Sequence, residues 1–324
     1  MKNLLLFQLL AIILFSCNKD DDEGDIDPQY KEKMQEFVIG ISQYAKSIKS
    51  TFAIIPQNGI ELVTSDGETT GPPDTLYLNA IDGNGQEDLF FGYDNDDQAT
   101  PSATTTYLRA YLDISKNAGN TILVTDYCST QSKMTSSYSL NSAAKYVSFA
   151  ADIRELNHIP LFPNPINAVN NSVVTKLSDV KNFLYLLNPE SYTTKAAFIS
   201  AITATNYDLL IMDLFFQDGT QFTSTEINQL KNKANGGKRL VISYMSIGEA
   251  EDYRYYWQTS WNSTKPAWMD RENPDWEGNF KVKYWEKEWQ NIIYGNNSSY
   301  LKKILDANFD GVYLDIIDAF EFYE

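Results

Sequence analysis

Five acidic residues stand at or just beyond the ends of apolar runs that have the composition of buried strands. Asp126, Asp213 and Asp315 end such runs, and Glu87 and Glu249 come just after others. A carboxyl group can act as general acid, general base or nucleophile, and two of them can divide these roles when one is ionised and the other is protonated. A single acid at a strand end is as often a helix cap. Five acids at one rim favour chemistry.

The elements that must position these acids alternate along the chain. Strands are predicted at residues 52–56, 76–81, 122–126, 146–150, 183–187, 207–213, 239–244 and 311–315, and helices at 29–49, 107–116, 193–205, 224–235, 285–294 and 298–307. Strands and helices that alternate in this way predict an α/β fold, the (β/α)8 TIM barrel, whose active sites lie at the C-terminal ends of the strands. Two domains with a boundary near residue 165 are the alternative.

The order of the elements predicts a circular permutation of this barrel. A parallel strand is normally followed by a covering helix, and no helix fits in the residues after the strand at 310–316. An amphipathic helix at 29–49 precedes all the strands. We therefore expect this helix to follow the last strand in space, in one domain that spans residues 29–324. The proline- and asparagine-rich segment at about 155–181 is then the linker between the natural ends of the barrel.

The first residues predict export and a lipid anchor. Residues 1–16 have the charge and apolar pattern of a signal peptide, and Leu14-Phe-Ser-Cys17 resembles a lipobox, in which Cys17 is lipidated. Residues 17–28 are acidic and resemble the export signal of surface lipoproteins of Bacteroidota. We expect a lipoprotein of the cell envelope, at the outer membrane and exposed on the cell surface. Its lipid is the only expected contact with the membrane.

Charge and composition exclude several function classes. The formal charge is −17, so nucleic acid is not an expected partner, whereas a neutral or cationic substrate is. His158 is the single histidine, which argues against a Ser-His-Asp triad and a histidine-rich zinc site. Cys128 is expected to be a small buried apolar residue. No dinucleotide or phosphate-binding fingerprint occurs. We expect a monomer without a metal ion or cofactor.

Four stretches in the second half of the chain carry a family resemblance. They are Asp208-Leu-Leu-Ile-Met-Asp213, Ser243-Tyr-Met-Ser-Ile-Gly-Glu-Ala-Glu-Asp-Tyr-Arg254, residues 272–285 and Gly311-Val-Tyr-Leu-Asp-Ile-Ile-Asp318. They resemble glycoside hydrolase family 114, which is similar to endo-α-1,4-polygalactosaminidases with a TIM-barrel fold. Residues 55–59, 80–82, 87–92 and 124–128 match as well. In the family those segments follow the strand that ends in Asp315, and here they precede it, as a permutation predicts.

The resemblance implies which residues act. It places the carboxyl pair on Asp315 and Glu87. We expect Asp315, at the end of a rigid strand, to be the nucleophile and Glu87, on a more adaptable loop, to be the general acid/base. Asp318 could replace Asp315, and Asp88 adjoins Glu87. Substrate contacts are expected from Asp213, Tyr244, Glu249, Asp252, Asp126, Asp318 and Tyr185, and stacking on sugar rings from Tyr185, Tyr127, Trp276 or Trp285. Arg254 is expected to form an ion pair with Glu251 or Asp252.

These expectations define one preferred function and two alternatives. The preferred function is hydrolysis of an α-1,4-linked galactosamine-type polysaccharide, whose ammonium groups suit carboxylates. One alternative is a non-catalytic carbohydrate-binding surface lipoprotein, and the other is a glycosidase that acts on a different polysaccharide. The preferred function and the carbohydrate-binding alternative differ in whether Asp315 and Glu87 converge in one cleft, as the glycosidase requires.

Overall fold

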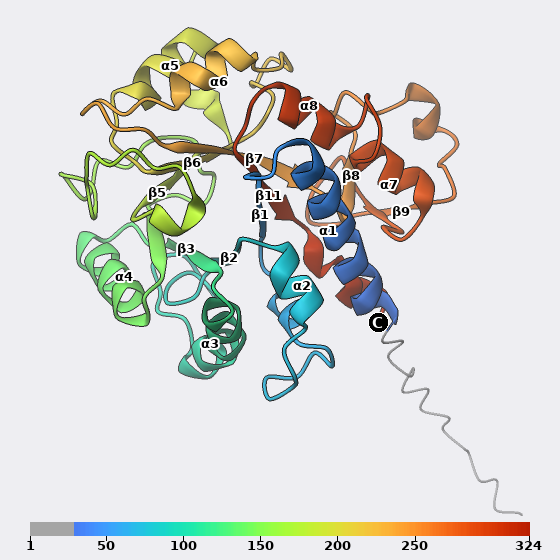
Figure 1. Cartoon of the computed structure of the whole chain (residues 1–324), viewed down its shortest axis with the longest axis horizontal. Coiled ribbons are helices and arrows are strands. Elements are labelled where there is room, and N and C mark those ends of the chain that lie inside the picture. The colour runs from blue at the N-terminus through green and yellow to red at the C-terminus, as the bar shows by residue number, and fades with distance from the viewer. Residues whose placement is uncertain (1–28) are drawn as a thin grey trace, which may run out of the picture.

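A computed structural model describes residues 29–324, in which strands lie at the centre and helices cover them from outside (Figure 1). The strands are β1 Ala53–Pro56, β2 Gly83–Glu87, β3 Thr121–Tyr127, β4 Val147–Ala151, β5 Phe183–Tyr185, β6 Leu209–Met212, β7 Leu240–Ser246, β8 Glu249–Glu251, β9 Met269–Glu272, β10 Asn279–Val282 and β11 Gly311–Asp315. The helices are α1 Gln29–Ile48, α2 Thr75–Ala80, α3 Ser102–Asn117, α4 Gln131–Ala144, α5 Lys195–Thr203, α6 Ser224–Leu230, α7 Lys287–Ile293 and α8 Tyr300–Asp306. Residues 1–16, Cys17 and the rest of the segment 17–28 lie outside the described residues. None of the described helices is long and apolar enough to span a membrane.

Eight of these strands form two parallel sheets. One sheet has the order β5-β6-β7-β11-β1, and the other has the order β2-β3-β4. A parallel bridge between Gln57 and Gly85 connects β1 to β2. The rings of Phe149 in β4 and Phe183 in β5 lie 5.8 Å apart. Strand β1 pairs in parallel with β11, with Ala53 opposite Gly311. The first sheet therefore contains strands from both halves of the sequence.

The helix α1 lies beside the last strand. Its apolar face is buried: Met34, Phe37, Val38, Ile41 and Ala45. Lys49, just after the helix, donates a hydrogen bond of 2.9 Å to the carboxylate of Asp310, which directly precedes β11. At the other end of α1, the hydroxyl of Tyr284 donates to the carbonyl of Tyr30 at 2.6 Å. Segments from the two ends of the described chain thus pack side by side (Figure 1).

The second predicted strand is wrong. Residues 76–80 belong to α2, and Ile81 is its C-terminal cap. Asp74 accepts a hydrogen bond from the backbone of Tyr77 and caps the start of this helix. The strand that occupies this place in the sheet is β2, with the sequence Gly-Asn-Gly-Gln-Glu. It contains no β-branched or aromatic residue, so composition could not indicate it. Glu87 consequently ends a strand and does not lie in a loop.

Other predicted elements are present with shifted bounds, and two features were missed. Helix α4 is rich in Ser and Thr and has no clear apolar stripe. The strands β8, β10 and β9 form a small antiparallel sheet in that order, between β7 and α7. Glu249 is the first residue of β8 and does not belong to a loop. This small sheet matters because it forms one wall of the site described below.

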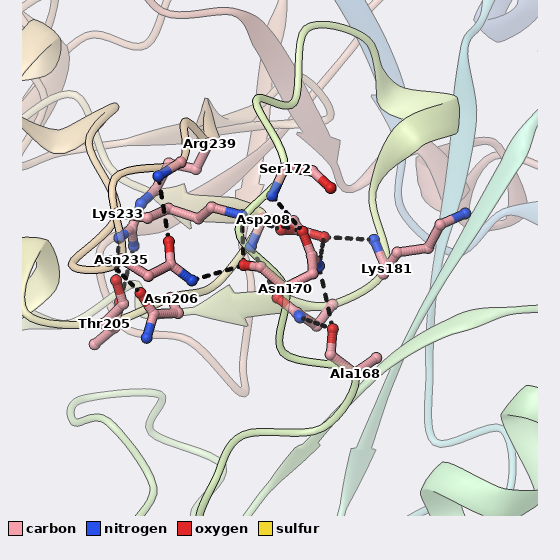
Figure 2. A network of polar contacts seen from close by, with 12 residues as sticks. Ala168, Asn170, Ser172, Lys181, Thr205, Asn206, Asp208, Lys233, Asn235 and Arg239 are labelled. Atoms are coloured by element: carbon pink, nitrogen blue, oxygen red, sulfur yellow. Dashed lines mark hydrogen bonds and ion pairs between the residues drawn. The ribbon is translucent and has the colours of Figure 1, made fainter.

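The segment at 155–181 contains only one short 3-10 helix, Leu177–Asp179. A buried polar network fastens it to the start of β6 (Figure 2). Asp208 accepts hydrogen bonds from the side chain of Asn170 and the backbone of Lys181, both at 2.9 Å. Lys233 pairs with the same carboxylate at 2.8 Å, and both charged side chains are fully buried. This segment is therefore anchored to the desolvated ion pair of Asp208 and Lys233.

Candidate active site

The strand ends surround a cavity of about 440 Å³. Its lining comes from the C-terminal ends of β1, β2, β7 and β11, from β8, and from loops around them. Six acidic and two basic side chains line it: Glu87, Asp213, Glu249, Glu251, Asp315, Asp318, Arg154 and Arg254. The active sites of barrel enzymes occupy the same place. The lining carries an excess of carboxyl groups.

Glu87 is held by hydrogen-bond donors from neighbouring strands. The amide of Gln57 donates to Oε2 at 2.6 Å, and that of Asn58 donates to the same atom at 3.2 Å. The hydroxyl of Tyr127 donates to Oε1. The backbone N–H of Glu87 in turn donates to Oδ1 of Asn58 at 3.1 Å. Both carboxyl oxygens therefore face donors, which fixes the side chain at the end of β2.

Asp315 occupies the corresponding place at the end of β11. Burial, assisted by the negative charges of Glu87 and Asp318, raises the pKa of Asp315 to about 7. The hydroxyl of Tyr244 donates to Oδ2 at 2.6 Å and opposes this rise. A carboxyl group with such a pKa can exchange a proton near neutral pH.

The chain turns sharply after both acids. Ile316 has φ 57° and Asp88 has φ 58°, so each acid is followed by a residue in the left-handed region. Such a conformation is uncommon for any residue except glycine, and it is least favourable for a β-branched one. Strained residues of this kind gather at functional sites, where surrounding structure enforces them. After Asp315 the chain stays at the cavity, because Ile316 and Asp318 also line it.

Four buried tyrosines pack around the two acids: Tyr127, Tyr185, Tyr244 and Tyr313. The hydroxyls of Tyr127 and Tyr244 donate to Glu87 and Asp315, as described above. The hydroxyl of Tyr185 donates to Oε1 of Gln57 at 3.3 Å. The rings of Tyr185 and Tyr313 lie 5.4 Å apart. Tyr313 fills the space in front of Gly85, where an added Cβ would lie 2.0 Å from its hydroxyl oxygen. The tyrosines thus pack together around the acids, and three of their hydroxyls donate hydrogen bonds to Glu87, Gln57 and Asp315.

Two arginines line the cavity, and Arg254 forms ion pairs with two of its acids. Arg254 contacts Asp213 at 2.6 Å and Glu251 at 2.5 Å. The expected ion pair with Glu251 is confirmed, and the second partner is Asp213 and not Asp252. The guanidinium of Arg154 lies 3.8 Å from the ring centroid of Tyr127 and contacts Asp88 at 2.9 Å. Arg154 therefore holds the tyrosine that contacts Glu87.

The remaining acids of the cavity differ in their surroundings. Glu249 is buried, and its Oε1 accepts a hydrogen bond of 2.8 Å from Asn273 and lies 3.4 Å from Nζ of Lys281. Burial raises the pKa of Asp318 to about 6. Asp318 is a second proton-exchanging group beside Asp315, which keeps it as the alternative acid that the sequence suggests.

The structure places three expected contact residues away from the cavity. Asp126 is fully buried, and its carboxylate accepts hydrogen bonds from the backbone of Phe90 and Phe91 and from Ser137 and Asn141. It fastens the loop after β2 and cannot reach a substrate. Asp252 is exposed but does not line the cavity. Trp285 packs against Tyr30, with ring centroids 5.0 Å apart, and supports α1. The rings of Tyr127, Tyr185 and Trp276 do line the cavity.

Among the lining residues that the sequence did not indicate as part of the site are Gln57, Asn58, Arg154 and Glu251. Gln57 and Asn58 belong to the stretch Ile55-Pro-Gln-Asn-Gly59 at the end of β1, a position that could have indicated them. Arg154 lies directly before the segment at about 155–181 that is expected to be the linker. Nothing in its local sequence indicates a contact with β2 and β3.

Other reactive residues lie apart from this chemistry. Cys128 is buried, as expected, and burial raises the pKa of its thiol to about 12. His158 contacts Asn157 and Asp152. Within residues 29–324, no group of His, Cys, Asp or Glu side chains is arranged to hold a metal ion.

The curated relatives match only part of the chain. An uncharacterised protein of Methanocaldococcus jannaschii is 41% identical over 160 residues, which cover 48% of this chain and 42% of that protein. One of Thermotoga maritima is 37% identical over 122 residues, which cover 38% of this chain and 36% of the relative. One of Deinococcus radiodurans is 39% identical over 123 residues, which cover 38% of this chain and 37% of the relative. The matched segment thus spans less than half the length of each relative.

The family model is matched by the second half of the chain, residues 170–323. This range begins before β5 and includes β11 with Asp315 and the acids Asp213, Glu249, Glu251 and Asp318. Glu87 and its donors lie outside it. The part of the chain from residue 170 to residue 323 is thus matched to glycoside-hydrolase family GH114, which supports a glycoside hydrolase.

Proposed function

We propose that this protein is a glycosidase in which Asp315 and Glu87 are the two catalytic carboxyl groups. The observation that carries the proposal is that both acids line one cavity, at the ends of strands that flank β1. Glycoside hydrolysis needs one carboxyl group that gives a proton and one that attacks the sugar or activates water. The pKa of about 7 for Asp315 supplies a transferable proton beside Glu87.

The substrate that we propose is a polysaccharide with cationic amino sugars, of the α-1,4-linked galactosamine type. The cavity has six acidic side chains against two arginines, so its lining is negative. A cleft lined by one sign of charge raises the local concentration of ligands of the opposite sign. Trp276, with 66% of its surface exposed, lines the cavity as a flat apolar face for a sugar ring. A neutral polysaccharide would gain nothing from the excess charge.

The first experiment is hydrolysis of α-1,4-linked galactosamine oligomers by the wild type and by Asp315→Asn and Glu87→Gln. We expect each variant to lose at least about 10³-fold in kcat, since either carboxyl group is needed for bond cleavage. Asp252→Asn is the matched control, because this exposed acid does not line the cavity. Wild-type turnover with full activity in either variant would refute the pair. Binding of oligomers without any turnover would instead favour the carbohydrate-binding alternative.

The roles of the two acids follow from the same variants. The raised pKa of Asp315 favours this residue as the proton donor, which is the reverse of the sequence-based assignment. In the sequence-based assignment Asp315 is the nucleophile and Glu87 the acid/base. Azide then restores turnover to Asp315→Ala and gives a glycosyl azide of inverted configuration. If the roles are exchanged, azide instead restores turnover to Glu87→Ala and gives a glycosyl azide of inverted configuration. Product stereochemistry from the wild type shows whether the reaction retains or inverts configuration.

We further propose that the eight parallel strands close into a (β/α)8 barrel whose chain order is circularly permuted. The contacts of α1 with the start of β11 support this order, and so does the bridge between β1 and β2. The family model matches only residues 170–323. A permutation predicts a partial match, because the model follows one chain order and the segment that has moved to the front no longer fits that order. The test is a variant in which a short linker joins residue 324 to residue 29 and the chain opens near residue 165. A native-like circular dichroism spectrum and cooperative unfolding are expected, and an unfolded product would contradict the proposal.

The anchor at Cys17 and the location on the cell surface remain a proposal that rests on the sequence. Incorporation of labelled palmitate into the wild type, but not into Cys17→Ser, would support lipidation. Accessibility of the anchored protein to added protease on intact cells then tests surface exposure. Labelling that is equal in both forms would exclude Cys17 as the lipidated residue.

A further inference from the structure

A second cavity, of about 390 Å³, adjoins the first. It is lined by the loops after β5 and β6 and by the chain after β8. Five residues line both cavities: Leu187, Asn188, Asp213, Tyr253 and Arg254. The ion pair between Asp213 and Arg254 therefore stands at the boundary between the two spaces. Each volume lies in the range of about 300–1,000 Å³ that small-molecule sites occupy.

Aromatic rings form the floor of this second cavity. The rings of Phe215 and Tyr255 are 5.7 Å apart and tilted by 32°. Tyr255 is 40% exposed, although its hydroxyl donates to the carbonyl of Ser298 at 3.1 Å. Tyr300 supports both rings from below, with centroid distances of 6.1 Å and 5.7 Å. An accessible ring held in place by its neighbours costs little entropy when it binds a ligand.

The boundary carries a second exposed ring. Tyr253 is 64% exposed, and its hydroxyl donates to Glu251 at 2.5 Å. The guanidinium of Arg254 lies 5.1 Å from the centroid of this ring. Tyr253 is thus held by two groups of the first cavity while its ring also faces the second. Among the five residues that line both cavities, Tyr253 is the one with an exposed ring.

We propose that the second cavity is a distal subsite that binds further sugar units of the same polysaccharide chain. This inference rests on the proposed function. The occupant is inferred from the continuity of the two cavities and from the row of exposed rings, since aromatic faces match the C–H faces of pyranose rings. Glu190 adds a carboxylate at this subsite. It suits an amino sugar as the acids of the first cavity do.

A subsite of this kind makes the enzyme depend on substrate length. An oligomer that fills only the first cavity gains nothing from Tyr255, whereas a longer one gains a ring contact. We expect the ratio of kcat/KM for long oligomers to that for short ones to fall about tenfold in Tyr255→Ala, through loss of one aromatic contact. Tyr255→Phe keeps the ring and retains most of the ratio.

The experiment measures this ratio for the wild type, Tyr255→Ala and Tyr255→Phe with galactosamine oligomers of increasing length. Tyr93→Ala is the matched control, because Tyr93 is 55% exposed and lines neither cavity. A ratio that Tyr255→Ala leaves unchanged would overturn the subsite, as would an equal fall in Tyr93→Ala.

A binding measurement separates this inference from the proposed function. Calorimetry with Asp315→Asn gives the affinity for long and short oligomers without turnover. If the wild type cleaves nothing but long oligomers bind more tightly in a Tyr255-dependent way, the subsite stands and the glycosidase proposal fails. If the wild type cleaves the oligomers and affinity does not depend on length, the subsite fails alone.

Discussion

The hydroxyl of Tyr244 donates a hydrogen bond of 2.6 Å to Oδ2 of Asp315. The two residues belong to adjacent parallel strands, β7 and β11, in which Tyr244 is paired with Tyr313, two residues before Asp315. The tyrosine therefore reaches up from the layer below to the carboxyl group. It is the one side-chain hydrogen bond that lowers the pKa of Asp315 against the effect of burial.

Tyr244→Phe is expected to shift the pH dependence of activity upward. Loss of the hydrogen bond removes the stabilisation of the ionised carboxylate, so the pKa of Asp315 rises further above about 7. We expect the corresponding limb of the pH profile of kcat/KM to move up by about 1 pH unit. Tyr313→Phe is the control, because the buried hydroxyl of Tyr313 has no partner within the described residues. Equal shifts in both variants would contradict the assignment.

Asp315→Asn is expected to stabilise the protein more at pH 8 than at pH 5. The pKa of Asp315 is raised to about 7 in the folded state, so the folded protein binds this proton more tightly than the unfolded chain does. The contribution to stability is present at low pH and is lost as pH rises through 7. Asparagine has no such loss. We expect the difference in free energy of unfolding between Asp315→Asn and the wild type to grow by about 1–2 kcal/mol from pH 5 to pH 8. This value allows for solvent in the cavity. Urea denaturation measures it, and a constant difference would contradict the linkage.

Arg154→Met is expected to lower kcat about tenfold, with a smaller effect on KM. Arg154 does not touch Glu87 directly, but it holds the ring of Tyr127, whose hydroxyl does. Displacement of a catalytic group by a fraction of an ångström can cost this much in rate. Steady-state kinetics separate the two constants. Arg154→Lys keeps the charge over the ring and should recover part of kcat, and a change confined to KM would show that Arg154 contacts substrate instead.

Lys233→Met is expected to destabilise the fold by about 3–5 kcal/mol, because it leaves the buried carboxylate of Asp208 without its charged partner. The double variant Asp208→Asn/Lys233→Met should recover part of this loss. Lys302→Met is the control, since Lys302 pairs with Asp306 at the surface, where loss costs about 0–1 kcal/mol. Urea denaturation gives all three values. Equal effects of the buried and surface changes would contradict the role of the network in Figure 2.

The sequence predicts the strands that are rich in β-branched and apolar residues, and it fails where a strand depends on its neighbours. The apolar run at 311–315 is β11. In contrast, β2 is formed by glycine and amide residues, and it exists because β3 pairs with it from Gly83 to Glu87. Helix α4 has no stripe to detect. Its place is set by β4, on which it packs.

The site was predicted better in its acids than in its supporting groups. Strand ends and the family resemblance led to Asp315 and Glu87, which line one cavity. Asp126 has the same position relative to its strand, yet it accepts backbone hydrogen bonds and is fully buried. Whether an acid at a strand end faces the cavity depends on the loop that covers it. That information lies in contacts between distant residues, such as Arg154 with Tyr127.

The close approach of Gly85 and Tyr313 has a consequence for stereochemistry. In a strand, alternate residues face the same side, so Glu87 lies two residues above Gly85 and Asp315 two residues above Tyr313. The phenol ring and the missing side chain thus act as a spacer beneath the two acids. The distance between two carboxyl groups decides whether a glycosidase retains or inverts configuration. We expect the contact between Gly85 and Tyr313, one layer below the acids, to influence that distance.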